Sequence, residues 1–170
     1  LRKKHLAQHD AKQGGWGRVH KFLFGPSEEL ALTEGSRGDK KSLQQGTNAL
    51  TKNMKIIDPV WGGVYQYSVD GWNEAHFEKI AWAQQKNLVL YSYGYAITQD
   101  PKFLQAAGDI KKFLTGFLLS PDGAFYTSMD ADLVKGTHSE EFFKLGDKER
   151  RAKGIPSIDK HIYARENGQG

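Results

Sequence analysis

The sequence predicts a mainly α-helical protein in which helical hairpins alternate with short glycine-rich turns, and three observations predict it. First, a turn former, a glycine and aromatic residues recur together at Asp10–Trp16, Asp58–Tyr65 and Ser120–Tyr126. Second, Gly14, Gly62 and Gly123 stand 48 and 61 residues apart, which leaves room for two helices between successive turns. Third, the intervening segments repeat apolar residues at helical spacing. Paired helices with this period favour an α/α solenoid or a closed α/α toroid, with the turns gathered at one end.

The first predicted pair of helices lies between the first and second turns. We expect a short helix at Ser27–Thr33, directly after Pro26. A longer helix is predicted from about Lys40 to Ile57, with Asp39 as its N-cap. One stripe of that helix is apolar and consists of Leu43, Leu50, Met54 and Ile57.

The second predicted pair lies between the second and third turns. A helix from about Ala75 to Ile97 is apolar on most of its surface from Leu88 onward, which is typical of a helix buried on several sides. Asp100 and Pro101 then give an N-cap and an N1 proline for a helix that ends near Leu118. Its wide apolar face consists of Phe103, Ala106, Ala107, Ile110, Phe113, Leu114, Phe117 and Leu118.

Strands are expected to be short and to belong to hairpins at the glycine-rich turns. The best candidates are Gly63–Tyr67 and Ala124–Ser128. Residues 134–154 are polar and lack clear periodicity, so we expect a long loop there with one short helix near Ser139–Leu145. The segment Ser157–Tyr163 is interpreted as leading into another helix.

Composition excludes several classes of function. The mean hydropathy is −0.63, and no run approaches the roughly 18 apolar residues that a membrane span needs. No apolar stretch follows the basic start at Leu1–Lys4, as a signal peptide would require, and no compartment is assigned. The chain has no cysteine, which excludes disulfides, thiol nucleophiles and Cys-ligated zinc within these residues. Paired histidines at metal-ligand spacing are also missing from the sequence, so we expect neither a metal nor a cofactor.

The net charge of +4 does not by itself predict a nucleic-acid partner. Recognition of nucleic acid needs a localised basic patch. Here basic residues stand beside acidic ones, as in Asp39–Lys41 and Asp147–Arg151. We therefore expect neither nucleic acid nor a membrane as a partner.

Three motifs in order resemble one known family. They are Asp58–Ser68 with its Trp-Gly-Gly-Val-Tyr core, His76–Lys79 with the sequence His-Phe-Glu-Lys, and Ser120–Asp132, which ends in Asp-Ala-Asp. Together they resemble the toroid part of the thioredoxin-domain-containing proteins of the spermatogenesis-associated protein 20 type. The resemblance extends from about Asp10 to Gly168.

This resemblance implies a partial α/α toroid, made of helical hairpins of a six-hairpin barrel. The barrel is related to the toroids of N-acylglucosamine 2-epimerases and six-hairpin glycosidases. Residues 1–170 would then be a fragment of a single toroid domain. The family's amino-terminal thioredoxin-like domain and the later hairpins of the ring are not among these residues, so both are expected partners in the full-length protein.

Candidate catalytic residues are His76, Glu78 and Asp130. An imidazole suits acid–base work near neutral pH, and paired carboxylates around a sugar are the usual apparatus of glycosidases. His76 and Glu78 are expected at the start of the predicted helix, and alternation along a strand would place Asp130 and Asp132 on one face. The alternative is structural: Glu78 pairs with a neighbouring cation, His76 binds a loop, and both aspartates form turns.

The aromatic residues at the turns are candidates for sugar contacts, because sugar rings stack on aromatic faces. The alternative is that they seal the hairpins against the helices. The proposed substrate-binding residues are Trp61, Tyr65, Trp72, Tyr126 and Asp132.

Two functional hypotheses follow. In the first, the chain is part of a carbohydrate-modifying enzyme with epimerase-like or glycosidase-like acid–base chemistry and a carbohydrate ligand. In the second, the toroid is a non-catalytic binding or scaffold module that accompanies a thioredoxin-like domain. The absence of a conventional catalytic motif, such as the nucleophile elbow Gly-x-Ser-x-Gly, motivates the second hypothesis.

Overall fold

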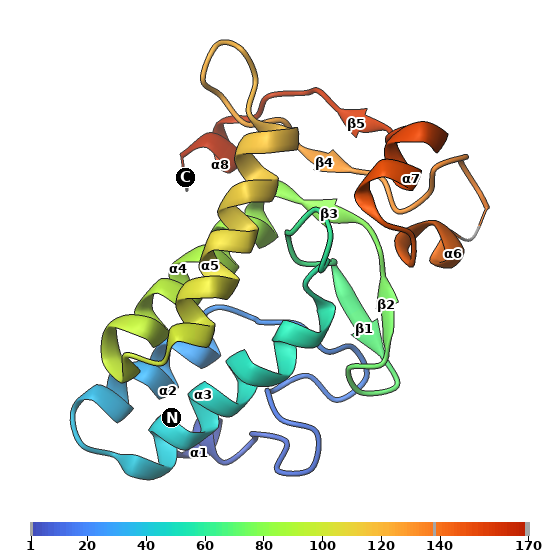
Figure 1. Cartoon of the computed structure of the whole chain (residues 1–170). Helices are drawn as coiled ribbons and strands as arrows, with labels where there is room; N and C mark the ends of the chain where they lie inside the picture. The colour runs from blue at the N-terminus through green and yellow to red at the C-terminus, as the bar shows by residue number, and fades with distance from the viewer. Residues whose placement is uncertain (1, 138, 169–170) are drawn as a thin grey trace.

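The computed structural model describes residues 2–137 and 139–168 and confirms the two predicted helical hairpins (Figure 1). Helices α2 (Pro26–Ser36) and α3 (Lys40–Asn53) pack together between the first and second glycine-rich turns. Helices α4 (Ala81–Thr98) and α5 (Pro101–Phe113) pack together between the second and third. Because α2 also contacts α4, the two hairpins lie side by side.

The predicted helix starts at Asp39 and Asp100 are confirmed. The side chain of Asp39 accepts hydrogen bonds from the backbone N–H groups of Lys41 and Ser42, both at 3.1 Å. Asp100 accepts from the N–H of Lys102 at 3.1 Å. At its C-terminus each of the two helices continues into a turn with a different hydrogen-bonding pattern. The chain after α3 forms the 3₁₀ turn η1 (Met54–Ile56), and that after α5 forms the π-helical turn η2 (Leu114–Leu118).

The predicted start of the long helix at Ala75 is wrong, because the helix begins at Ala81. Residues before it are extended and pair with other strands. Strand β2 (Glu74–His76) pairs antiparallel with β1 (Tyr67–Val69), and β3 (Lys79–Ile80) leads into α4. These short strands depend on partners far away in the sequence, so local helical spacing could not reveal them.

A small three-stranded sheet joins the end of the chain to the middle. Strand β4 (Ser128–Met129) lies between β3 and β5 (Ile158–Asp159), and both pairings are antiparallel. Met129 is opposite Lys79 on one side and opposite Ile158 on the other. The strands predicted at 63–67 and 124–128 begin later than expected, at Tyr67 and Ser128, which are the last residues of the two predicted ranges.

The segment expected to be a long polar loop contains more helix than predicted. Helix α6 (Glu140–Phe143) lies where the short helix was expected, and α7 (Asp147–Lys153) follows it. Two further short helices, α1 (Arg2–Leu6) and α8 (Ala164–Asn167), lie near the two ends of the chain. Figure 1 shows α6 and α7 on the same side of the molecule as the β1–β2 hairpin.

One hydrophobic core runs between the helix pairs and under the turns. Its members include Leu50, Tyr91, Phe103, Ile110 and Phe113, none more than 1% exposed. Apolar burial of this extent is the main stabilising contribution to such a fold. Within the described residues, none of the helices is both long enough and apolar enough to cross a membrane.

Candidate functional site

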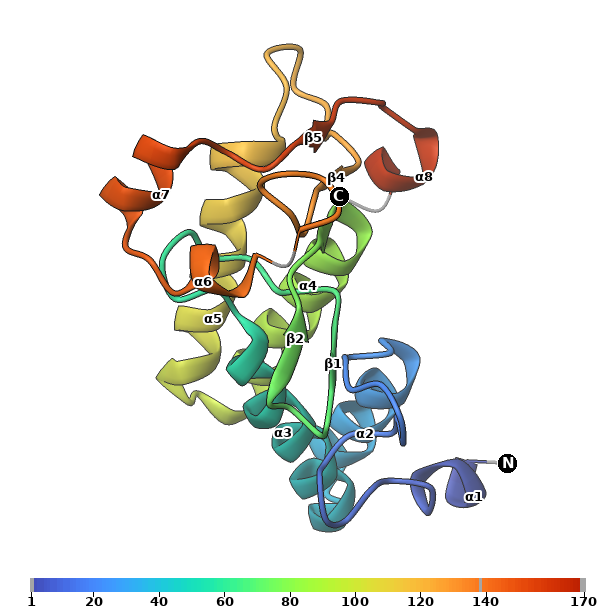
Figure 2. The same ribbon diagram turned by 90° about the vertical axis from the view of Figure 1, so that its right-hand side faces the viewer.

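A cleft of about 1260 Å³ lies between the β1–β2 hairpin and the loop that joins β4 to α6. The hairpin and α6 lie next to each other in the view of Figure 2. Four of the predicted site residues in addition to Tyr65 line this cleft: His76, Glu78, Asp130 and Asp132. The structure therefore brings together the residues that the sequence separates by more than fifty positions.

His76 and Glu78 contact each other in the cleft. His76 Nε2 lies 3.8 Å from Glu78 Oε2, and the two side chains are 42% and 31% exposed. They lie on an extended segment rather than on a helix, and in extended backbone residues two apart point to the same side. Burial raises the pKa of Glu78, and the nearby negative charge of Asp130 adds to the rise, whereas His76 opposes it. A carboxyl group with raised proton affinity beside an imidazole can serve in proton transfer.

Asp130 and Asp132 lie in a turn that follows β4 rather than on the strand itself. Asp130 Oδ1 accepts a hydrogen bond from the N–H of Asp132 at 3.1 Å. Asp132 Oδ2 accepts from the N–H of Gly136 at 3.1 Å. Both aspartates thus form turn hydrogen bonds, as the structural alternative predicts. Each of them also borders the cleft.

The aromatic candidates separate into two groups. Tyr65 and Tyr67 line the cleft, and the Tyr67 ring stacks on His76 with ring centroids 4.9 Å apart. Trp61 and Trp72 are 1% and 4% exposed and lie in the core. Trp61 donates to Asp147 at 2.7 Å, and Trp72 donates to the carbonyl of Gln13 at 2.8 Å, so both indoles hold loops in place.

Tyr126 occupies the position in the third turn that Tyr65 occupies in the second. Its N–H donates to the carbonyl of Leu118 at 2.8 Å, just as the N–H of Tyr65 donates to that of Ile56 at 2.8 Å. Tyr126 packs partly buried against the core and is not among the cleft-lining residues. Of the five proposed substrate-binding residues, Tyr65 and Asp132 therefore border the cleft.

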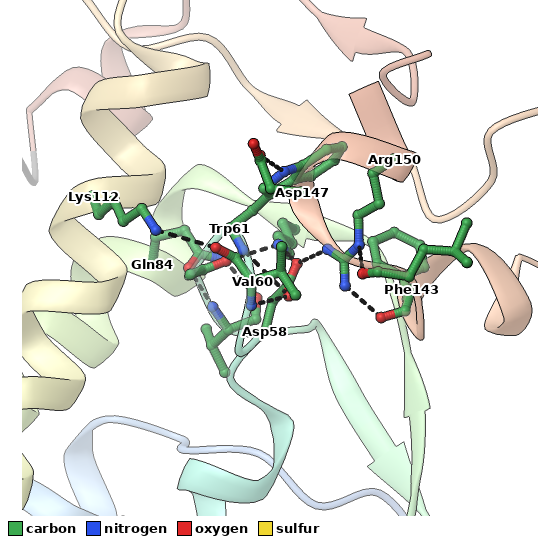
Figure 3. A network of polar contacts seen from close by, with 12 residues as sticks. Asp58, Val60, Trp61, Gln84, Lys112, Phe143, Asp147 and Arg150 are labelled. Atoms are coloured by element: carbon green, nitrogen blue, oxygen red, sulfur yellow. Dashed lines mark hydrogen bonds and ion pairs between the residues drawn. The ribbon is translucent and has the colours of Figure 1, made fainter. Parts of the chain in front are cut away.

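Beneath the cleft, the buried carboxylate of Asp58 holds two buried cations, Lys79 and Arg150. Figure 3 shows Asp58 and Arg150 in this contact. Asp58 Oδ2 lies 2.7 Å from Lys79 Nζ and 2.7 Å from Arg150 Nη1, and none of the three side chains is exposed. Lys79 also donates to the carbonyl of Gly62 at 2.7 Å, which closes the turn. Burial works against ionisation of Asp58, but the attraction of Lys79 and Arg150 outweighs it and keeps the pKa of Asp58 below its usual range.

The first turn repeats half of this arrangement. Lys21 Nζ lies 2.8 Å from Asp10 Oδ2 and donates to the carbonyl of Gly14 at 3.0 Å. In both turns the N–H of the first glycine donates to the carbonyl of the aspartate, at 2.8 Å and 3.0 Å. The third turn has Ser120 in place of the aspartate, and its hydroxyl accepts from the N–H of Ala124 at 3.1 Å.

Negative charge is concentrated in the cleft, although the whole chain carries a net charge of +4. Lys55 and His76 are the basic side chains among the described lining residues. Carboxylates on the walls of a cleft create a local potential that attracts cations and repels anions. The acidic lining residues are Glu74, Glu78, Asp130, Asp132, Glu140 and Asp159.

Sequence reasoning missed Lys79 and Arg150 as parts of the site. Both occur among other charged residues, where a lysine or arginine is normally solvated. The one available signal is that an aspartate precedes both Gly-Gly pairs by four residues and a lysine follows each pair. The lysine lies 6 residues after Gly15 and 16 after Gly63, so its variable spacing hides the pairing. In the described part of the chain, no group of three or more His, Asp or Glu side chains could hold a metal ion.

Comparison with known sequences identifies relatives that are 31% identical to this chain. No protein-family model matches the chain. Spermatogenesis-associated protein 20 of Mus musculus is 31% identical over 134 residues, which are 73% of this chain and 17% of the mouse protein. The Homo sapiens protein matches with the same identity and the same coverage. The chain thus spans about a sixth of the length of the curated relatives it matches.

Comparison with solved structures identifies the fold. A sugar epimerase from a ruminal bacterium superposes with a TM-score of 0.66 at 18% identity, over 79% of this chain and 39% of the epimerase. An α-1,6-mannanase of a Salegentibacter species, solved with α-1,6-mannotriose, superposes with a TM-score of 0.62 at 18% identity, over 90% of this chain and 39% of the mannanase. These similarities confirm the predicted fold class, a mainly α-helical partial α/α toroid with short β-hairpin loops.

Proposed function

The chain is homologous to a segment of spermatogenesis-associated protein 20 and has the α/α-toroid fold of sugar epimerases and mannanases, and from this premise we propose that its cleft binds a sugar and performs acid–base chemistry on it. The observation that carries the proposal is the meeting of His76, Glu78 and Asp130 in one cleft at the turn end of the toroid. Loops held by a rigid scaffold are where catalytic residues commonly lie.

In this proposal His76 and Glu78 are the acid–base pair. Because Nε2 and Oε2 are 3.8 Å apart, a change in the charge of one group alters the proton affinity of the other. Asp130 supports the pair by raising the proton affinity of Glu78. We favour epimerase-like transfer, in which one group of the pair removes the proton from a carbon next to a carbonyl, the resulting open-chain enolate turns over in the cleft, and the pair returns a proton to its opposite face. The composition of the sugar does not change in that reaction.

The acidic lining supports a neutral sugar as the substrate class. A phosphorylated or carboxylated sugar would bring negative charge against the carboxylates of Glu74, Glu78, Asp130 and Asp132. A neutral sugar has hydroxyl groups that donate hydrogen bonds to those carboxylates. The stacked rings of Tyr67 and His76 add an aromatic edge against which the apolar face of a sugar can pack.

We also propose that residues 1–170 are one part of a single toroid domain. The superposition covers 79% of this chain but only 39% of the epimerase chain, which supports this proposal. Further hairpins of a six-hairpin ring would complete the cleft. A thioredoxin-like domain elsewhere in the full-length protein belongs to the same proposal.

One observation favours the non-catalytic alternative. Asp130 and Asp132 are both engaged in turn hydrogen bonds, and such aspartates need no catalytic role. Under this alternative the cleft binds a sugar or a segment of another domain without converting it.

The test is turnover by the full-length protein. Neutral gluco- and manno-configured sugars are incubated in D₂O, and epimerisation with deuterium incorporation at the reacting carbon is followed by NMR. We expect turnover that His76→Ala abolishes and His161→Ala retains, because His161 is an exposed histidine outside the cleft lining. Turnover that survives His76→Ala in a folded protein would remove the assigned pair, and sugar binding without any turnover would favour the non-catalytic alternative.

A further inference from the structure

The segment formed by α6 and α7, residues 139–153, borders the cleft, and buried Arg150 connects it to the second turn. Ser139 and Glu140 of this segment are among the cleft-lining residues. Arg150 Nη1 donates to Asp58 at 2.7 Å, Nε donates to the carbonyl of Leu145 at 2.9 Å, and Nη2 donates to the carbonyl of Phe143 (Figure 3). A single guanidinium therefore joins the turn to two backbone positions of the segment.

The first turn shows that an arginine is not needed to build such a turn. There Lys21 alone neutralises Asp10 and closes the glycine loop. In the second turn Lys79 makes the same two contacts, to Asp58 and to Gly62. Arg150 is thus an additional group, and the two backbone carbonyls to which it donates, those of Leu145 and Phe143, belong to the α6–α7 segment.

We propose that Arg150 is a positioning residue that holds the α6–α7 segment against the second turn and so sets the width of the cleft. Lys79 follows Glu78 directly in the sequence, and its ammonium binds the same oxygen of Asp58 that Arg150 binds. This oxygen of Asp58 therefore links strand β3, which follows Glu78, to the α6–α7 segment, which contains Glu140.

The chemistry of the arginine side chain suits this role. A planar guanidinium presents five donors in a rigid fork and can bind acceptors in several directions, whereas an ammonium is a single point. Arg150 also lies over the Trp61 ring, with Cζ 5.1 Å from the ring centroid. Trp61 in turn donates to Asp147 of α7, so the indole is a second tether of the same segment.

The functional relevance of the cleft rests on the proposed function, but the positioning of the α6–α7 segment by Arg150 does not. A distance measurement without any sugar tests it, so a failure of the sugar assay and a failure of this inference are separate results. Residues 1–170 contain no cysteine, so pairs of nitroxide labels can be placed there at introduced cysteines in the full-length protein, once any cysteine outside this range has been replaced by serine. Lys41→Cys on α3 and Lys148→Cys on α7 are exposed sites that report the position of the segment relative to the scaffold. Lys41→Cys with Lys111→Cys on α5 reports the scaffold alone.

The decisive variant is Arg150→Met, read by pulsed electron resonance. Methionine keeps apolar volume over Trp61 and leaves the Asp58–Lys79 pair neutral overall, as in the first turn. We expect the α3–α7 distance distribution to broaden by about twofold while the α3–α5 distribution stays unchanged, because only a local unit is released. Arg150→Lys, which keeps a cation for Asp58 but lacks the fork, should broaden the α3–α7 distribution in the same direction by a smaller amount.

An α3–α7 distribution that keeps its width in both folded variants would overturn the proposal. Equal broadening of both label pairs would also overturn it, because Arg150 would then support the fold as a whole rather than the position of one segment. Should the methionine variant fail to fold, the lysine variant decides between the same outcomes.

Discussion

Lys79 donates to Asp58 at 2.7 Å in an ion pair from which solvent is fully excluded. The pair joins the second glycine-rich turn to the strand that enters α4, and this strand begins one residue after Glu78 of the cleft. Burial lowers the pKa of Lys79 to about 8, so the ammonium remains charged at neutral pH. The position of His76 and Glu78, the proposed acid–base pair, therefore depends on the Asp58–Lys79 ion pair.

Asp58→Ala should destabilise the protein far more than Asp10→Ala. Removing Asp58 leaves two buried cations, Lys79 and Arg150, without their counter-ion, which costs about 3–5 kcal/mol. Asp10 is 23% exposed and faces one lysine, so its loss should cost about half as much. Chemical denaturation of the two variants measures the difference. Equal losses would show that the Asp58 group has no special role in stability.

Gly63→Ala should be more harmful than Gly123→Ala, although both glycines have positive φ angles, +76° and +82°. A Cβ at Gly63 would lie 2.6 Å from the ring of Phe113, whereas a Cβ at Gly123 meets no atom within 4 Å. We expect a loss of about 3 kcal/mol for Gly63→Ala, from backbone strain and overpacking together. Gly123→Ala should cost about 1 kcal/mol from backbone strain alone. Thermal unfolding compares them, and a reversed order would contradict the turn geometry.

Glu28 of α2 makes stability depend on pH. Its side chain is 0% exposed, and burial raises its pKa to about 7, although the N–H of Gly25 donates to it. Between pH 4.5 and 7 the folded protein keeps a proton that the unfolded chain has lost, so raising the pH through this window favours unfolding. Relative to Glu28→Gln, the parent should lose about 3 kcal/mol across the window and nothing further above it. A pH-independent difference between the two proteins would show that Glu28 is ionised when folded.

Much of the fold could be predicted from the sequence because it depends on local signals. The spacing of Gly14, Gly62 and Gly123 predicted the two hairpins, and the caps at Asp39 and Asp100 predicted two helix starts, all of which the structure confirms. The two-residue strand at Lys79 has no local signal, because its partner, Met129, is fifty residues away. The helix was for that reason predicted to start six residues too early, at Ala75 instead of Ala81.

The sequence predicted the polar residues of the candidate site better than its aromatic residues. His76, Glu78, Asp130 and Asp132 meet in one cleft because the strands and turns that carry them converge at one end of the toroid. Whether an aromatic residue after a Gly-Gly pair faces the cleft or the core depends on the neighbouring helices. Trp61 packs against Phe117 and Phe142 for that reason, and its neighbour Tyr65 reaches the cleft. The catalytic and binding roles of these residues remain proposals.

The charge of the cleft predicts which sugars bind. Mannose and mannose 6-phosphate differ in one phosphate group, and the phosphate would face the carboxylates of Glu74, Asp130 and Asp132. We expect the neutral sugar to bind at least about tenfold more tightly at low salt, with the difference shrinking as salt screens the carboxylates. Calorimetric titration at two salt concentrations measures both effects. Tighter binding of the phosphate would mean that the acidic lining does not face the ligand.

The most direct test of the proposed sugar site is an amide chemical-shift map of the full-length protein, isotope-labelled over residues 1–170 and titrated with the neutral sugars cellobiose and α-1,6-mannotriose. The proposed site predicts saturable shifts for amides of residues 65–78 and 128–132, with the amides of α3 and α5 unaffected. Shifts confined to α3 or α5, or none at all for either sugar at concentrations that saturate a millimolar site, would contradict a carbohydrate cleft at the glycine–aromatic end of the toroid.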